Sequence, residues 1–282
     1  MTLQLMETGA NNKNHSLFDH AAFKKYDTVN LELSIQLSQN ELSFCIKNDF
    51  EVIAIQNITT PNYEIFEIIK NNSWLNKKYQ SVNLSLINKL HTLVPTTIFE
   101  EKNEKNYLSF NHRIDDNIEI VSDKLKNIDA YNVYGITKAE KEIINTFFPK
   151  AQIKHFGSCL IDLMLSKENI NKHVFVSIKK NLLCILLINH NKLQLFNTFE
   201  FKSTEDCFYY IMFVLEQIKF DPKEVDFCFL DQISKNSKIY DLSYKFIKNI
   251  RFINNHRIKL SPNINDIPIH YYHSLIHQAS CV

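Results

Sequence analysis

Three histidines near the C-terminus have the spacing of a helical metal site. The segment 270–277 reads HYYHSLIH, and His270, His273 and His277 would share one helix face because they are three and four residues apart. Imidazole nitrogens at such a spacing can bind zinc. No ordered carboxylate or cysteine partner is evident, apart from Cys281 close to the chain end. We therefore favour a packing or solvated face, and we expect no metal.

A cysteine that opens a predicted helix is the second chemical candidate. Cys159 follows Gly157-Ser158, and His155 lies four residues before it. A helix N-terminus lowers the pKa of an exposed thiol and makes it more nucleophilic. The flanking pattern G-x-S-x-G of a nucleophile elbow is absent around Ser158. A buried structural thiol is the favoured interpretation, and we predict no catalytic residue.

Glycine is unusually scarce in a chain of 282 residues. Only Gly9, Gly135 and Gly157 are present, whereas average usage is about 7%. Loops that wrap phosphate depend on glycine because its missing side chain lets backbone N–H groups approach the oxygens closely. The composition therefore argues against a glycine-rich nucleotide loop.

The charge balance bears on possible partners. The chain carries 32 basic and 31 acidic residues, a net charge of +1, so it has no overall field that would attract nucleic acid or an anionic membrane. We expect no direct nucleic-acid binding. The six cysteines form no CxxC pair, and no run approaches 18 apolar residues. These features predict a cytoplasmic protein without a transmembrane segment.

One predicted helix is covered in aromatic residues. Phe208, Tyr209, Tyr210 and Phe213 follow one another closely. Such a stripe usually belongs to a core, although tyrosine at a rim is also typical of protein–protein interfaces.

The periodicity of apolar residues predicts a duplicated β-β-β-α-β unit. The better copy occupies 173–253 and a looser copy occupies roughly 30–130, each with three strand-length apolar runs before an amphipathic helix. The same patterns predict a strand over 107–110 and a helix over 237–250. Thr137 with Glu140 three residues later has the spacing of a capping box.

These elements predict the organisation of the chain. We expect a flexible N-terminal leader over 1–25, a first lobe over 26–155, and a second lobe over 156–282 that includes a C-terminal tail. The fold class is α/β, with two lobes that each contain a mixed five-stranded sheet and flanking helices.

With these units in place, the chain resembles the actin/Hsp70/sugar-kinase superfamily, whose core is a duplicated ribonuclease-H-like unit. More narrowly, it resembles an uncharacterised domain-of-unknown-function family of Bacteroidetes proteins. The second lobe is also similar to pilus-assembly and secretion-platform members, in which a helix like SCLIDLML precedes the strands. The narrower likeness lies in LSIQLSQNELSFCI (33–46), TLVPTTIFEE (92–101), IDAYNVYGI (128–136), NTFEFKSTEDCFYYI (197–211) and the closing CV.

The resemblance implies a nucleotide between the lobes, held by Asp-x-Gly turns in the first hairpin of each lobe and by glycine pairs elsewhere. This sequence departs from that pattern at every one of these places. The positions read Gln36-Leu37-Ser38, Ser177-Ile178-Lys179, Lys202 in the loop after the third strand, and Asp231-Gln232 at the adenosine position. The missing glycines remove close phosphate contacts, and the missing acids remove Mg²⁺ ligands. We therefore expect no bound cofactor.

The sequence leads to a cytoplasmic actin-like binding module or scaffold with protein partners and no enzymatic activity. One alternative is an active or switch-like ATP binder. Another is an accessory protein linked to RNA metabolism. A ribonuclease-H-type nuclease is excluded, because Glu32 is the only acid on the first strand and two-metal chemistry needs clustered carboxylates.

Overall fold

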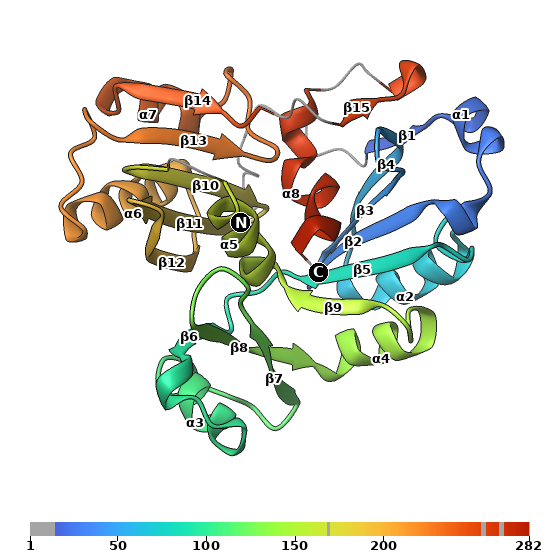
Figure 1. Ribbon diagram of the computed structural model, residues 1–282, viewed down its shortest axis with the longest axis horizontal. Coiled ribbons are helices and arrows are strands. Elements are labelled where there is room, and N and C mark those ends of the chain that lie inside the picture. Colours follow the sequence, from blue (N-terminus) through green and yellow to red (C-terminus); the bar gives the residue numbers. More distant parts are fainter. Residues whose placement is uncertain (1–14, 168–169, 255–257, 265–267, 282) are drawn as a thin grey trace, which may run out of the picture. The chain divides into compact units, whose positions relative to one another are not determined.

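The computed structural model describes residues 15–167, 170–254, 258–264 and 268–281 (Figure 1). The chain divides into two compact units. We call residues 15–163, 258–264 and 275–281 the first lobe, and residues 164–254 and 268–274 the second lobe. The boundary falls inside α5 (Phe156–Leu165), and the C-terminal tail is shared between the lobes. The division therefore differs from the predicted one at 155/156, with the whole tail in the second lobe.

The second lobe contains one mixed five-stranded sheet in the order β12-β11-β10-β13-β14. Strands β10, β11 and β12 pair antiparallel as a meander, β13 pairs parallel with β10, and β14 pairs parallel with β13. Parallel neighbours need crossover connections, which helices α6 and α7 supply. The elements are β10 (His173–Lys179), β11 (Leu182–Asn189), β12 (Lys192–Glu200), α6 (Thr204–Gln217), β13 (Asp226–Leu230), α7 (Lys238–Phe246) and β14 (Asn249–Phe252).

The core of the first lobe repeats this order strand for strand. The sheet runs β4-β3-β2-β5-β9, with an antiparallel meander followed by two parallel strands. The predicted duplication and fold class are confirmed. The elements are β2 (Glu32–Ser38), β3 (Glu41–Lys47), β4 (Glu51–Thr59), α2 (Asn62–Asn71), β5 (Ser81–Leu86), α4 (Lys138–Phe147) and β9 (Gln152–His155).

Two further strands extend the first-lobe sheet at β4. Strand β1 (His15–Phe18) pairs antiparallel with β4, and β15 (Lys259–Leu260) pairs parallel with its beginning. Helix α1 (His20–Lys25) follows β1, with Asp19 as its N-cap. The prediction of a flexible leader over 1–25 is therefore wrong from residue 15 onward, while residues 1–14 lie outside the described residues.

An insertion between β5 and β9 forms a separate three-stranded antiparallel sheet, β6-β8-β7, in the first lobe. The predicted strand over 107–110 is wrong, because this segment is helical. Only Leu108 of that segment is fully buried, against Val94 and Val133, and one helical turn satisfies this single burial. The elements are β6 (His91–Pro95), η2 (Thr96–Ile98), η3 (Glu101–Asn103), α3 (Glu104–Ser109), β7 (Ile118–Lys124) and β8 (Ala130–Thr137).

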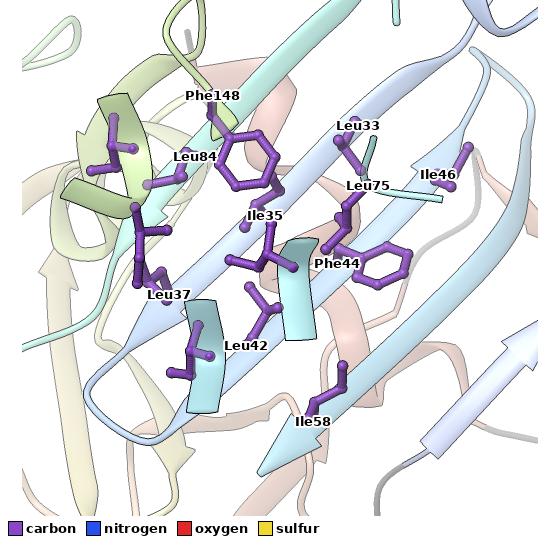
Figure 2. Packing of buried hydrophobic residues seen from close by; sticks show 14 of the residues in the cluster. Leu33, Ile35, Leu37, Leu42, Phe44, Ile46, Ile58, Leu75, Leu84 and Phe148 are labelled. Atoms are coloured by element: carbon purple, nitrogen blue, oxygen red, sulfur yellow. The ribbon is translucent and has the colours of Figure 1, made fainter. Parts of the chain in front are cut away.

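In each lobe, every second residue of the central strands faces the helices, and these apolar residues form the core. Figure 2 shows Leu33, Ile35 and Leu37 of β2 beside Leu42 and Phe44 of β3. These residues pack under α2 and α4, whose buried isoleucines belong to the same cluster. Burial of one such side chain stabilises the fold by about 1.5–3 kcal/mol. In the second lobe Val174, Val176 and Ile178 of β10 play the same part under α6 and α7.

Capping residues set the helix starts, and at α4 the cap is the one that the sequence predicts. Thr137 and Glu140 form the capping box of α4, and Ser203 caps α6. The helix predicted over 237–250 ends earlier, at Phe246. The following residues pair with β13 as β14, since backbone hydrogen bonding to the sheet replaces the last helical turn.

Four short elements follow β15 in the described residues of the C-terminal tail. They are η4 (Pro262–Ile264), η5 (Ile269–Tyr272), α8 (His273–Ile276) and η6 (Gln278–Cys281).

Candidate functional site

Asp231 marks the place in the second lobe where the resemblance puts adenosine contacts. It follows the last residue of β13, whose parallel neighbour is β10. Carboxyl ends of parallel strands lie at the same sheet edge, so Asp231 reaches the residues near the end of β10. Its φ of 62° is left-handed, a conformation that aspartate tolerates better than most residues.

The side chains of Ser177, Lys179 and Ser274 converge on the Asp231 carboxylate. The Ser177 hydroxyl donates to Oδ2 at 2.5 Å, and Lys179 Nζ lies 3.3 Å from the same oxygen. The backbone N–H and the hydroxyl of Ser274 donate to Oδ1 at 3.1 and 2.6 Å. All four residues are buried, and Asp231 is completely inaccessible. We call them the Asp231 cluster.

The Asp231 cluster balances its own charge. The Lys179 ammonium faces a carboxylate, and both oxygens of that carboxylate accept hydrogen bonds. A buried carboxylate also repels an incoming phosphate by like charge. The arrangement holds two strand ends and the tail together, and its donors are directed at Asp231.

The other second-lobe positions of the predicted set have separate surroundings. Lys202 is exposed at the start of α6, where its N–H donates to Asp206 Oδ2 at 3.1 Å. The α6 N-terminus therefore already carries a carboxylate of its own chain, which suits the helix dipole. Gln232 is half-buried directly after Asp231.

In the first lobe Gln36 and Ser38 lie on the sheet face opposite the apolar core. Gln36 is buried, and the half-buried Ser38 donates weakly through its hydroxyl to the carbonyl of Glu41 at 3.4 Å. Ser85 is on the same face, because Gln36 and Ser85 are register partners across β2 and β5.

Gln278 of the tail closes this polar face of the first lobe. Its amide nitrogen donates to the carbonyls of Ile35 and Asn83 at 2.9 and 2.8 Å. Its amide oxygen accepts from the Ser85 hydroxyl at 2.8 Å. The side chain is almost fully buried, and a primary amide matches two acceptors and one donor with its own two donors and one acceptor.

Sequence reasoning missed Ser274 and Gln278. The apolar pair Leu275 and Ile276 between them signals burial of the tail, and both are inaccessible. Nothing in the local pattern shows which strands lie beneath, since the contacts join residues about 40 to 240 positions apart.

The three histidines of the tail do not share one regular helix, since His270 lies in η5, His273 begins α8 and His277 follows α8. His270 Nε2 lies 3.1 Å from the Ile233 carbonyl, and its ring packs 4.4 Å from that of Phe252. Burial lowers the pKa of His270. His270 and His273 belong to the second lobe and His277 to the first. In the part of the chain that the structure describes, no three His, Cys, Asp or Glu residues are grouped to hold a metal ion.

The geometry does not make His155 a base for Cys159. His155 Nδ1 accepts from the Gly157 N–H at 3.0 Å, and Nε2 lies 3.2 Å from the Asn88 carbonyl. Burial lowers the pKa of His155 to about 4, so the ring is neutral at pH 7 with one donor and one acceptor. Both ring nitrogens are engaged in structural bonds, and Cys159 is buried.

Asp123 completes the polar network around His155. Its Oδ2 accepts a hydrogen bond from the backbone N–H of His155 at 2.8 Å, and its Oδ1 accepts one from the Tyr134 hydroxyl at 3.2 Å. Burial raises the pKa of Asp123. This network fixes the end of β9 and the start of α5.

A family model described as "Protein of unknown function (DUF3822)" matches residues 20–250. The chain belongs to this family. No curated protein shows significant similarity to it.

Two solved structures place the DUF3822 chain in the actin-like fold. A Bacteroides thetaiotaomicron protein with an actin-like ATPase fold and unknown function is 24% identical, with a TM-score of 0.73 over 84% of this chain and 95% of that one. The PilM–PilN type IV pilus biogenesis complex contains a chain 12% identical, with a TM-score of 0.56 over 90% of this chain and 98% of that one. At these identities the similarity establishes the fold alone, and it confirms the predicted one.

Among the described residues of this DUF3822 protein, every helix is too short or too polar to cross a lipid bilayer.

Proposed function

We propose that this DUF3822 protein is a non-catalytic actin-like binding module in which side chains of the protein replace the phosphate contacts of the fold. It acts through protein partners and hydrolyses no nucleotide. The observation that carries the proposal is the Asp231 cluster.

The charge distribution of the cluster supports the proposal. At a phosphate site the free donors of a backbone turn and a lysine face an anion. Here Lys179 and Ser177 face Asp231, which brings its own negative charge. Freeing Lys179 for a phosphate would leave Asp231 buried without its ionic partner, at a cost of about 3–5 kcal/mol.

The first lobe supports the proposal independently. Gln278 holds the Ser85 hydroxyl and two carbonyls of the central strands. Carbonyl groups and a neutral amide offer no charge to bind Mg²⁺ or a triphosphate strongly, since Mg²⁺ sites rely on carboxylates and phosphate oxygens.

The location and the partner form part of the same proposal. We place the protein in the cytoplasm, where the buried thiols Cys45, Cys159, Cys184, Cys207 and Cys228 stay reduced. Similarity to a chain of the PilM–PilN complex makes a protein the partner to test first.

Calorimetric titration of the full chain with ATP and Mg²⁺ tests the proposal. We expect no saturable heat and no nucleotide-dependent rise in melting temperature. Fluorescence of Trp74, the single tryptophan, verifies that the titrated protein is folded. A micromolar dissociation constant that a chelator abolishes would overturn the proposal, as would steady phosphate release that Lys179→Met removes.

A further inference from the structure

The outer face of α6 in the second lobe is both aromatic and acidic. Glu205, Tyr209, Phe213 and Glu216 recur at helical spacing and lie on one exposed face. Tyr209 is 61% exposed and Phe213 is 39% exposed, and their rings stack at 5.9 Å. Water therefore contacts a continuous aromatic surface on this helix.

The neighbouring helix α7 extends this surface. Tyr244 and Phe246 at its C-terminal end are 67% and 54% exposed. The Phe246 ring lies 5.2 Å from Phe208 of α6, so the two helices are joined by aromatic contacts. Tyr244 lies about 200° around α7 from Phe246 and stacks on Tyr240 of the same helix, so it faces away from α6. We call the surface formed by Tyr209, Phe213 and Phe246 the α6–α7 face.

Clustering distinguishes the α6–α7 face from scattered exposed side chains. Ten large hydrophobic residues are exposed in the described part of the chain, and these two helices contain four of them. Single exposed hydrophobics need no explanation, whereas Tyr209 and Phe213 are stacked side by side on one helix face, and such patches mark interaction sites. Tyrosine and phenylalanine are also the residue types enriched at interfaces.

The charges around the α6–α7 face are complementary to each other. Helix α6 carries three acids, Glu205, Asp206 and Glu216, and no basic residue. Helix α7 exposes Lys238 and Lys245 against the single acid Asp241. A two-fold axis between the two helices would bring the acidic α6 of one copy against the basic α7 of another, twice over.

We infer that the α6–α7 face is the docking site for a second copy of this chain, in an isologous dimer with α6 against α7 of the partner. The aromatic side chains supply the apolar centre of the interface, and the charge pairs around it set the register. This inference goes beyond the proposed function and does not depend on whether nucleotide binds.

Analytical ultracentrifugation of the full chain across the micromolar range tests the inference. We expect a monomer–dimer equilibrium. Tyr209→Ser combined with Phe213→Ser should raise the dimer dissociation constant at least about tenfold, because it removes the apolar centre of the interface. Phe110→Ser is the matched control, since Phe110 is 89% exposed but lies in the first lobe, and it should leave the constant unchanged.

Charge reversal gives a second test that needs no knowledge of the register. Glu205→Lys with Glu216→Lys makes both helices basic, and Lys238→Glu with Lys245→Glu makes both acidic. Each double variant should be monomeric alone, and a mixture of the two should form a heterodimer. A chain that stays monomeric at high micromolar concentration overturns the inference. A dimer unaffected by Tyr209→Ser with Phe213→Ser also overturns it, as does a mixture of the charge variants that does not associate.

Discussion

The two lobes have the same strand order, but they differ in the residues on the sheet face that lies opposite the helices. In the second lobe this face is apolar at Phe175, Cys228 and Leu230, which occupy neighbouring register positions. The corresponding first-lobe positions hold Ser34, Asn83 and Ser85, which are just as buried. One face is closed mainly by packing and the other mainly by hydrogen bonds.

This difference shows that the helix-covered face carries the fold, while the other face can diverge. The apolar clusters under α2 with α4 and under α6 with α7 have the same layout. On the opposite faces the second lobe concentrates its polar groups in the Asp231 cluster, and the first lobe distributes them over several strands. Removal of single groups should therefore have a larger effect in the second lobe.

The largest effect is expected from Asp231→Asn. The substitution leaves Lys179 buried beside a neutral amide, so the second lobe should lose about 3–5 kcal/mol of its free energy of unfolding. Hydrogen–deuterium exchange of β10 and β13 amides measures the loss.

Asp226→Asn is the matched control for Asp231→Asn, because the Asp226 side chain is 50% exposed and forms an ion pair with the His173 ring. It should cost less than about 1 kcal/mol. Adding Lys179→Met to Asp231→Asn should recover much of the stability, and a double variant as unstable as Asp231→Asn would contradict the charge argument.

Gln278→Ala should have the next largest effect, in the first lobe. It leaves the Ser85 hydroxyl and two buried carbonyls without the amide of Gln278, at a cost of about 1–3 kcal/mol. Urea unfolding followed by Trp74 fluorescence reports it, since Trp74 packs against Phe18 and Phe23 of the same lobe. Gln217→Ala, at an exposed position, is the control. Equal losses of unfolding free energy in the two variants would show that the hydrogen bonds of Gln278 do not stabilise the lobe.

The free energy of unfolding of the first lobe should depend on pH through His155, by an amount similar to or smaller than the effect of Gln278→Ala. The pKa of His155 is lowered to about 4 from 6.5 by burial, so the unfolded chain binds more protons between these values. Stability is then lost as pH falls from 6.5 to 4, by up to about 3 kcal/mol for this residue.

His155→Asn should lose less stability over the same pH range, because it keeps an acceptor for Gly157 without a titrating ring. The raised pKa of Asp123 acts in the opposite direction, since the native state retains its proton above pH 3.8. Asp123 is present in both proteins, so the difference between them reports His155. Identical pH profiles would contradict the assignment.

The smallest effects should come from the helix caps, where the lobes are alike. Thr137→Ala at α4 and Ser237→Ala at α7 each remove a side-chain cap and should each cost about 1 kcal/mol. Thermal unfolding with local amide exchange measures both. A clearly larger cost in one lobe would show that the similarity of the helix-covered faces does not extend to the helix starts.

The alternation of apolar and polar residues along strands and the capping residues of helices made much of the fold predictable. The strands of both meanders and the capped start of α4 were expected, since these signals are local. The helical segment around Leu108 was not, because its aromatic and apolar residues suit a strand equally well. Strands β1 and β15 are too short for a periodic pattern, and their pairing with β4 is a long-range contact.

The candidate site was only partly predictable. The resemblance identified Ser177, Lys179 and Asp231 as unusual positions, and the parallel register of β10 and β13 brings them together. Their convergence with Ser274 depends on the path of the tail. Sequence patterns contain no information on which buried partner a polar residue such as Gln278 will meet.

The position of β15 and Gln278 in the first lobe has a consequence for synthesis on the ribosome. A domain made of the first half of a chain can usually fold while the rest is being translated. Here the first-lobe sheet receives β15 at its edge and Gln278 on its central strands, and both are translated after nearly all of the second lobe. The lobe that begins first is therefore completed last, because its sheet lacks β15 and Gln278 until the tail has been translated.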